Sequence, residues 1–305
     1  MRQDIICDMA RASRTSRIYL IVAVVIIGVF LFTRVCRVHP LHSTSPKLEG
    51  NSPAGETVWL TANGSRLKTR VYSSARTSEH PVLVIVLHGD SPFGPPSYQY
   101  IFARKATEQI DDLVAAAILR PGYTDDTGDT SQGTRGQTTG DNYTAQVVDA
   151  IAGIVRQLKA KYSASHVIVA GHSGGAAIAG DLIGRAPGLA DGALLVSCPC
   201  DVPAFRKHMA EKQMYPMWLL PVNSVSPLDL IPDVPLTTHV RMLVGIEDSV
   251  APPAITEEYA AGLRARGVDV RVMEVPGEEH DMFLEPVVFE QLKELAALLE
   301  APAKQ

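Results

Sequence analysis

A serine between glycines stands where a short apolar run ends, and its type and setting suit nucleophilic chemistry. The run Val167–Ala170 is rich in β-branched side chains, as in a strand buried on both faces, and Gly171–Gly175 has the pattern G-x-S-x-G around Ser173. The small residues Ala176–Ala179 suit a buried helix. A strand that turns into a helix through one serine exposes that hydroxyl in a strained turn, where glycine relieves the crowding. The pattern predicts Ser173 as a nucleophile; a plain glycine-rich β–α connection is the alternative.

Other groups with catalytic chemistry follow predicted strands elsewhere in the chain. His88–Asp90 comes after one apolar strand, Asp248 after a second and His280 after a third. The order serine, aspartate, histidine, each just after a strand, resembles the α/β-hydrolase superfamily over residues 55–300. The resemblance implies that His280 takes the proton of the serine as general base and that Asp248 orients and stabilises its imidazole.

Two backbone N–H groups are expected to bind the oxyanion that forms when the serine attacks a carbonyl. The N–H of Gly174 opens the predicted helix, where backbone donors and the helix dipole favour negative charge. In the superfamily the loop after the strand that ends at Leu87 supplies the second donor, and the His-Gly match assigns it to the backbone of Asp90. A carboxylate beside an oxyanion would oppose it, so we expect the Asp90 side chain to point away. His88 is expected to bond the loop backbone as a structural histidine.

The triad acid has three candidates. Glu247 and Asp248 are adjacent in the loop after a predicted strand. The Gly-x-x-Asp spacing that is usual in the superfamily, counted from Gly245, selects Asp248. Asp201 is the third candidate, because some members carry the acid after the preceding strand.

The fold class expected from these elements is α/β, with a mostly parallel twisted central sheet and helices on both faces. Asn63-Gly64 between two β-rich runs predicts an antiparallel hairpin at the sheet edge. An amphipathic pattern predicts a helix over 142–162. The predicted strands are 57–60, 67–72, 82–87, 113–119, 167–170, 192–197, 240–245 and 268–275. The other predicted helices are 98–111, a helix that begins at 176 and ends near 186, 253–266 and 287–299.

A small cap is expected after the sixth strand, at about 199–239, by resemblance to the superfamily. This region is rich in proline, methionine and aromatic residues, which suit a mobile cover over an apolar acyl pocket. They also suit the packing of a short subdomain, and the two interpretations do not exclude each other. The long loop 124–141 shows no periodicity and is the second segment expected to influence substrate choice. Cys198 and Cys200 are interpreted either as a small disulfide, formed in an oxidising compartment, or as two buried thiols.

The amino-terminal segment predicts a membrane anchor. Residues 18–36 begin with an uncharged, apolar stretch, and arginines flank that stretch on both sides. Residues 1–17 form a basic tail, and residues 37–54 are interpreted as a linker. A cleaved signal peptide is the alternative, but no small-x-small cleavage site follows. The protein is expected to cross the membrane once, with its catalytic domain, 55–300, on the extracytoplasmic side.

Composition limits the partners. The 305 residues are 46% hydrophobic and 20% charged, with a formal net charge of −5, so a large core is expected and no basic patch suggests nucleic acid. No cysteine or histidine cluster has the spacing of a metal site, and the predicted chemistry needs neither a metal nor another cofactor. The expected partners are a small-molecule acyl substrate and, through the amino-terminal helix, a membrane. The oligomeric state is not determined by the sequence.

The function expected from the resemblance is a serine hydrolase that cleaves a carboxylic ester through an acyl-enzyme on Ser173, with Asp248 and His280 completing the triad. A small peptidase or amidase, or an acyltransferase, is possible on the same scaffold. A non-catalytic membrane-tethered binding protein is the alternative from another class, because fold alone does not establish activity.

Overall fold

The computed structural model describes residues 55–92 and 94–301. The predicted tail, anchor and linker, 1–17, 18–36 and 37–54, lie outside these residues and stay predictions. Within the described ranges, no helix has both the length and the apolar character that a membrane crossing requires.

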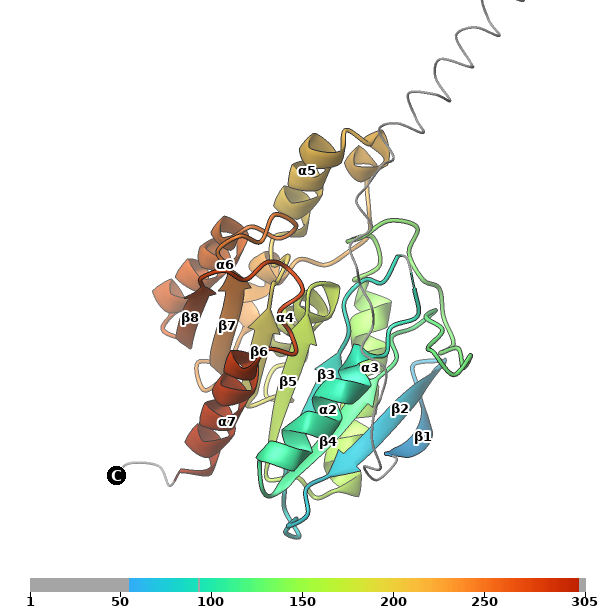
Figure 1. Ribbon diagram of the computed structural model, residues 1–305, viewed down its shortest axis with the longest axis vertical. Coiled ribbons are helices and arrows are strands. Elements are labelled where there is room, and N and C mark those ends of the chain that lie inside the picture. The colour runs from blue at the N-terminus through green and yellow to red at the C-terminus, as the bar shows by residue number, and fades with distance from the viewer. Residues whose placement is uncertain (1–54, 93, 302–305) are drawn as a thin grey trace, which may run out of the picture. The chain divides into compact units, whose positions relative to one another are not determined.

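One eight-stranded sheet organises the described residues, with the strands in the order β1-β2-β4-β3-β5-β6-β7-β8 (Figure 1). The pairs β1·β2 and β2·β4 are antiparallel, and every other neighbouring pair is parallel. The expected mostly parallel sheet is therefore confirmed. The strands are β1 (Glu56–Ala62), β2 (Ser65–Ser73), β3 (Val82–Leu87), β4 (Leu113–Ile118), β5 (His166–His172), β6 (Gly192–Val196), β7 (His239–Gly245) and β8 (Asp269–Val275).

The hairpin predicted at the sheet edge is confirmed. Ala62 pairs with Ser65, so the connection is the two residues Asn63 and Gly64, with φ angles of 48° and 76°. Both residues must enter the left-handed region to match the right-handed twist of the flanking strands, and Asn-Gly does so at low cost. This turn sets the register of β1, the outermost strand at that edge.

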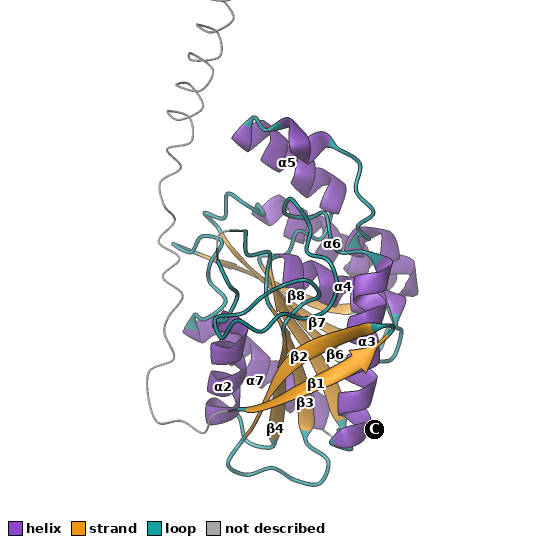
Figure 2. Ribbon diagram, turned by 90° about the vertical axis from the view of Figure 1, so that its right-hand side faces the viewer, coloured by secondary structure: helices purple, strands orange, loops and turns teal. Residues whose placement is uncertain are grey.

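Helices cover both faces of the sheet, as Figure 2 shows. On one face α2 and α7 pack against the strands in one hydrophobic core. On the other face α3, α4 and α6 form a second and larger core. The central strands are buried on both sides, which explains their near-continuous apolar sequences. The helices are α2 (Tyr98–Gln109), α3 (Ala145–Lys161), α4 (Gly174–Arg185), α5 (Val202–Gln213), α6 (Pro253–Arg266) and α7 (Pro286–Glu300).

The cap region consists of α5 and two 3₁₀ helices, η1 (Pro216–Leu219) and η2 (Pro227–Asp233). Phe205, Met209 and Trp218 pack with Ile255 of α6 in a small separate core. These apolar residues therefore hold a subdomain together, which is the second of the two interpretations of this sequence. The large apolar side chains exposed on the cap are Met214, Tyr215, Leu219, Leu220 and Leu236.

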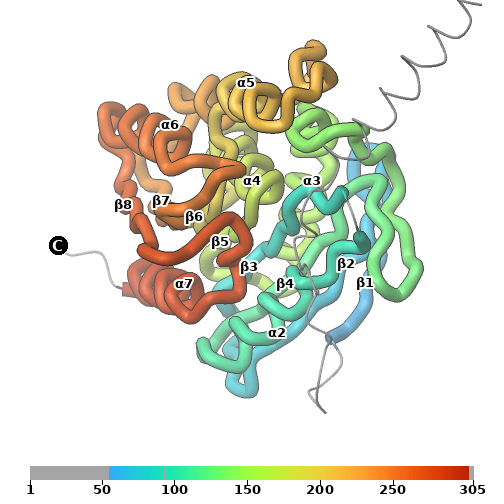
Figure 3. Tube along the Cα trace, turned by 45° about the horizontal axis from the view of Figure 1, so that its top comes forward, coloured from blue at the N-terminus to red at the C-terminus, as the bar shows by residue number. Residues whose placement is uncertain are grey.

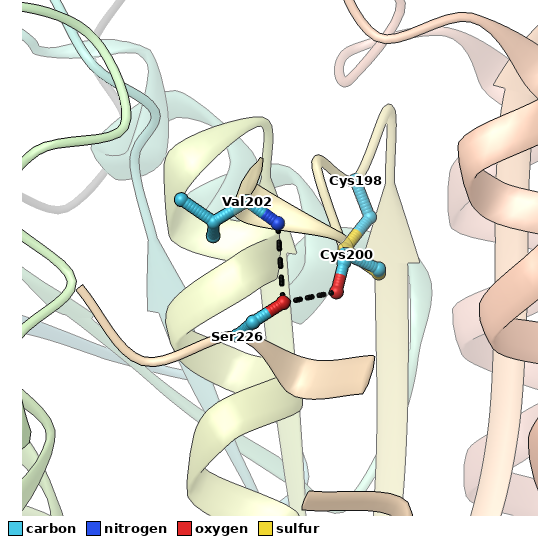
Figure 4. Close-up of a disulfide and its surroundings, with 4 residues drawn as sticks. All are labelled: Cys198, Cys200, Val202 and Ser226. Atoms are coloured by element: carbon cyan, nitrogen blue, oxygen red, sulfur yellow. Dashed lines mark hydrogen bonds between the residues drawn. A yellow bond between two sulfur atoms is a disulfide. The ribbon is translucent and has the colours of Figure 1, made fainter. Parts of the chain in front are cut away.

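A disulfide joins Cys198 to Cys200 where β6 leads into the cap (Figure 4). Both cysteines are fully buried. Ser226, which precedes η2, accepts a hydrogen bond from Val202 N–H at 3.1 Å and donates one to the Cys200 carbonyl at 3.1 Å. The start of α5 and the start of η2 are thus tied together directly above the end of β6.

Candidate active site

Ser173 occupies the turn between β5 and α4, and its backbone is strained. Its φ of 53° and ψ of −124° lie outside the regions that most side-chain-bearing residues adopt. The turn is tight enough that a Cβ on Gly171 would overlap the Gly175 carbonyl, and a Cβ on Gly175 would overlap the Leu87 carbonyl. The two glycines of the pattern are therefore needed where strand, turn and helix crowd together.

Three segments bring a serine, a histidine and an aspartate into one hydrogen-bonded line. His280, in the segment between β8 and α7, lies with Nε2 2.9 Å from Ser173 Oγ, although the two residues are 107 positions apart. Its Nδ1 lies 2.9 Å from Asp248 Oδ2 and 3.0 Å from Oδ1. Because the carboxylate only accepts, Nδ1–H donates to Asp248, and Nε2 is left to accept from the serine hydroxyl. Figure 3 shows this segment beside the end of β5.

Asp248 is held by more than its histidine. Its Oδ1 also accepts the N–H groups of Val250 at 2.9 Å and Ala251 at 2.8 Å. Burial alone would raise the pKa of this carboxyl, yet the hydrogen bonds from His280, Ala251 and Val250 together hold the pKa below its ordinary value. The carboxylate is thus kept ionised and fixed in orientation beside the imidazole.

The other two acid candidates lie elsewhere. Glu247 is exposed. Asp201 accepts from Ala204 N–H at 3.0 Å and caps α5, which satisfies one of the free amides at that helix end. Of the three, Asp248 is the acid that the structure places on His280.

The two backbone N–H groups predicted to bind the oxyanion belong to Gly174 and Asp90. Gly174 is the first residue of α4, so its N–H has no acceptor within the helix. The loop after β3 approaches closely, since a Cβ on Gly89 would lie 2.9 Å from Ser173 Cβ. Among the described residues, the N–H of Asp90 has no protein acceptor.

The side chain of Asp90 does not point away from the site, and this expectation was wrong. A Cβ on Gly174 would lie 2.7 Å from Asp90 Oδ1, so the carboxylate rests against the helix that carries one predicted oxyanion donor. Arg120 donates to Oδ1 at 2.9 Å, and Tyr143 Oη at 2.6 Å and Gly140 N–H at 2.9 Å donate to Oδ2. The negative charge is tolerated there because a fully buried guanidinium neutralises it.

This ion pair also determines the charge state of Asp90. Burial would raise the pKa of the carboxyl, but the positive charge of Arg120 and the hydrogen bonds from Tyr143 and Gly140 lower it. Asp90 thus links three segments beneath the nucleophile turn: the loop after β3, the segment after β4 and the end of the long loop.

His88 is a structural histidine, as expected. Its Nδ1 bonds the Gly89 carbonyl at 2.7 Å, and its Nε2 accepts the Arg120 N–H at 3.0 Å. Burial, followed by the nearby charge of Arg120, lowers its pKa to about 3. A neutral His88 therefore braces the loop and takes no part in the line from Ser173 to Asp248.

Sequence reasoning missed His172 and Tyr98. His172 is the variable residue of the G-x-S-x-G pattern, and Tyr98 opens α2. Tyr98 Oη accepts from Gly89 N–H at 2.5 Å and lies 2.9 Å from His172 Nδ1, while His172 Nε2 lies 2.9 Å from the His280 carbonyl. The only signal in the sequence was His172 itself, a polar aromatic residue at the end of an otherwise apolar strand.

An open hollow of about 290 Å³ lies between the cap and the end of the long loop. Residues 137–144 form one wall, and residues 217–223 at the cap edge form the other. Arg206 of α5 joins the walls by donating to the Thr138 hydroxyl and the Thr139 carbonyl on one side, and to the Met217 and Leu220 carbonyls on the other. The triad residues are not among those that line this hollow.

No metal cluster was found in the described ranges: three or more His, Cys, Asp or Glu side chains are nowhere grouped so as to hold an ion there.

A model of the prolyl oligopeptidase family matches residues 123–300, which is more than half of the chain. The match begins after the loop that carries His88 and Asp90 and includes Ser173, Asp248 and His280. No match was found among curated proteins.

Solved structures with the same fold include both peptidases and an esterase. A puromycin-hydrolyzing peptidase from Mycobacterium tuberculosis aligns with 83% of this chain at 18% identity and a TM-score of 0.64, but the match spans only 40% of that peptidase. Est1E from Butyrivibrio proteoclasticus aligns with 81% of this chain and 99% of its own length, at 13% identity and a TM-score of 0.58. An acylaminoacyl peptidase from Pyrococcus horikoshii aligns with 81% of this chain and 41% of its own, at 13% identity and a TM-score of 0.57. At these identities the likeness establishes the fold.

Proposed function

The chain belongs to the prolyl oligopeptidase family, whose members are serine hydrolases with the α/β-hydrolase fold, and from this premise we propose that it hydrolyses a carboxylic ester through an acyl-enzyme on Ser173. The observation that carries the proposal is the continuous line from Ser173 Oγ through His280 to Asp248, with both hydrogen bonds at 2.9 Å. A serine hydroxyl is a weak nucleophile until a correctly oriented base removes its proton, and this line supplies that base.

In the proposed acylation, Ser173 Oγ forms a bond to the ester carbonyl carbon while its proton passes to His280 Nε2. The carbonyl oxygen becomes an oxyanion, which the N–H groups of Gly174 and Asp90 bind. His280 then returns the proton to the alcohol oxygen as the carbon–oxygen bond breaks. Asp248 stabilises the imidazolium that exists between these two transfers.

Deacylation repeats the sequence with water as the nucleophile. His280 takes a proton from the water as its oxygen attacks the acyl carbon, and the proton returns to Ser173 Oγ as the acid leaves. The same route with an alcohol in place of water would be acyl transfer.

An ester substrate is supported by the alignment with Est1E, which extends over 99% of that chain. Hydrolysis of an amide or peptide bond is the second candidate. The family match and the puromycin-hydrolyzing and acylaminoacyl peptidases among the structural relatives favour it. The two candidates share the acyl-enzyme and differ only in the leaving group that His280 must protonate.

The test compares leaving groups on one acyl chain. The full chain in detergent is assayed with a p-nitrophenyl ester and the p-nitroanilide of the same acid, and each kcat/KM is divided by the uncatalysed rate constant of that substrate, since esters react faster by themselves. A greater acceleration of the ester supports an esterase, and a greater acceleration of the anilide reassigns the protein to amide hydrolysis.

Ser173→Ala is the matched control and is expected to lower turnover by about 10⁴–10⁶, as the loss of a triad nucleophile does elsewhere. Labelling of Ser173 by a fluorophosphonate, read by mass spectrometry, locates the reactive residue. A folded wild-type protein that neither labels nor hydrolyses either substrate would contradict the proposal and favour a binding protein.

A further inference from the structure

His172 connects two parts of the candidate site that lie far apart in the sequence. Its ring is almost fully buried, at 5% exposure, between Tyr98 and His280. On one side Tyr98 Oη lies 2.9 Å from Nδ1 and also accepts the Gly89 N–H of the loop after β3. On the other side Nε2 lies 2.9 Å from the carbonyl of His280. The chain of hydrogen bonds thus begins in the predicted oxyanion loop and ends on the backbone of the predicted general base.

The donors and acceptors in this chain fit only one arrangement of protons. The His280 carbonyl can only accept, so the single proton of a neutral His172 sits on Nε2 and donates to it. Nδ1 is then without a proton and accepts from the Tyr98 hydroxyl, whose oxygen in turn accepts from Gly89 N–H. Every polar atom of the two side chains is satisfied in this arrangement, and in no other that keeps all three hydrogen bonds.

The environment keeps His172 neutral. Burial, followed by the positive charge that His280 can carry, lowers the pKa of His172 to about 4. A proton on Nδ1 would face the Tyr98 oxygen and leave the buried tyrosine hydrogen without an acceptor. Above that pKa the arrangement therefore persists while His280 gains and loses its proton in turnover.

We propose that Tyr98 and His172 are positioning residues that fix the oxyanion loop and the general base relative to each other through one hydrogen-bond relay. The inference rests on the proposed function, because it assigns the relay to the same reaction. Neither residue belongs to the triad. Their role is geometric: the donor loop and His280 sit on separate segments, and an ångström of relative displacement is enough to lower turnover substantially.

Ser197 supports the same carbonyl from a second side, since its hydroxyl donates to the His280 oxygen at 3.0 Å. Two donors on one carbonyl hold the backbone of His280 in place independently of its ring. Loss of the relay therefore leaves His280 attached through Ser197, and the fold is expected to survive.

Tyr98→Phe tests the relay, and Tyr100→Phe is its matched control. Both substitutions delete one hydroxyl from the first turn of α2, but Tyr100 Oη donates to Asp125, in a cluster that contains none of the triad. Tyr98→Phe is expected to lower kcat about 10–100-fold with little change in KM, because it leaves Gly89 N–H without a partner and frees the loop. Tyr100→Phe is expected to retain the wild-type kcat.

His172 is tested by a pair of substitutions. His172→Phe keeps the ring and deletes both hydrogen bonds, so it is expected to lower kcat about as much as Tyr98→Phe does. His172→Gln supplies both a donor and an acceptor and is expected to recover part of that loss. Equal activities of the Phe and Gln variants would contradict a role for the hydrogen bonds.

The outcomes separate the relay from the proposed function. Nitrogen NMR of the full chain labelled at histidine is expected to show His172 protonated at Nε2 and bare at Nδ1 at neutral pH, and a proton on Nδ1 overturns the relay whether or not substrate is turned over. Absence of fluorophosphonate labelling of wild-type Ser173 overturns the proposed function instead. If the fluorophosphonate labels Ser173 of Tyr98→Phe and of His172→Phe at the same rate as Ser173 of the wild type, the positioning role is wrong.

Discussion

Carboxyl groups are buried in two regions of the molecule, and the regions differ in the number of hydrogen-bond donors that these groups receive. Beyond the carboxyl ends of the strands, Asp248 and Asp90 each receive several donors: His280 and two backbone amides for the first, Arg120, Tyr143 and a backbone amide for the second. In the middle of α4, Asp181 is fully buried and neither of its oxygens has a hydrogen-bond partner. The Tyr259 hydroxyl and the Thr256 hydroxyl of α6 are also buried without a partner.

The contrast shows that burial raises the pKa of each of these three carboxyls, and that hydrogen-bond donors and nearby positive charge reverse the shift where they are present. The pKa values of Asp248 and Asp90 are lowered although burial opposes the shift. The pKa of Asp181 is raised well above its ordinary value, chiefly by burial, with the charge of Arg185 opposing it. The site region therefore holds fixed negative charges, whereas the helix interior holds a carboxyl that is more stable with its proton.

The largest effect is expected for the carboxylate that faces the imidazole. Asp248→Asn should lower kcat about 10⁴-fold, equivalent to about 5.5 kcal/mol, because an amide cannot hold His280 in the tautomer that accepts from Ser173. Glu247→Gln is the matched control and should change kcat little, since Glu247 is exposed. The kcat values of both variants are measured by steady-state kinetics, with the substrate that the leaving-group test identifies as preferred. A large loss in the Glu247 variant and a small loss in the Asp248 variant would reassign the acid.

The next effect concerns the pair between Asp90 and Arg120. Asp90→Asn should lower the free energy of unfolding by about 3–5 kcal/mol, because it leaves the buried guanidinium of Arg120 without a counter-charge. Chemical denaturation at neutral pH measures the loss. A carboxylate whose pKa is lowered in the folded state contributes stability that is present above the unfolded pKa of about 3.9 and is lost as the pH falls through the folded pKa. The difference in the free energy of unfolding between the wild type and the variant should therefore become smaller as the pH falls. A difference that stays constant with pH would contradict the ion pair.

The smallest effect has the opposite sign. Asp181→Asn should raise the free energy of unfolding at neutral pH by about 1–3 kcal/mol. For a domain of this size, each kcal/mol raises the midpoint of thermal unfolding by about 2–4 °C. A carboxyl whose pKa is raised by folding loses stability as the pH rises above its unfolded pKa of about 3.9, because the unfolded chain releases the proton first. The gain should thus grow with pH and vanish near pH 3. Asp233→Asn, at an exposed aspartate of η2 whose charge is not among the causes of the Asp181 shift, serves as the control. A destabilised Asp181 variant at pH 8 would mean that its carboxylate has a partner.

Local patterns in the sequence were enough for the strands and for the helices outside the cap, whereas the helix Val202–Gln213 within the cap was not predicted. Alternating and continuous apolar runs located the strands, and the bounds differ from the structure by few residues: the last strand was predicted at 268–275 and lies at 269–275, and the helix predicted at 142–162 lies at 145–161. Asn63 and Gly64 determined the hairpin, since few other dipeptides adopt two left-handed conformations in succession. The glycines around Ser173 predicted its strained turn for the same local reason.

The packing of the cap and the conformation of the loop after β3 depend on contacts with residues distant in the sequence, which no local pattern encodes. Whether Asp90 turns toward Gly174 or away depends on Arg120, in the segment after β4, and on Tyr143, just before α3. The two interpretations of the cap differed only in what its apolar residues touch, and the small core around Trp218 came from α6 as well as from the cap itself.

The sequence by itself determined the strained serine turn, the edge hairpin, the alternation of strands and helices, and the order in which serine, aspartate and histidine follow their strands. The first three follow from periodicity or turn chemistry in short stretches of the chain, and the order of the three catalytic residues is the one that resembles the α/β-hydrolase superfamily. The tertiary structure alone decided that Ser173 and His280 meet at 2.9 Å, that the carboxylate of Asp90 is neutralised by Arg120, and that His172 and Tyr98 join the two halves of the site. The physical reason is that strand order brings the carboxyl ends of β3, β5, β7 and β8 to one edge of the sheet, and side chains from distant loops are then selected by the hydrogen bonds that burial obliges them to make.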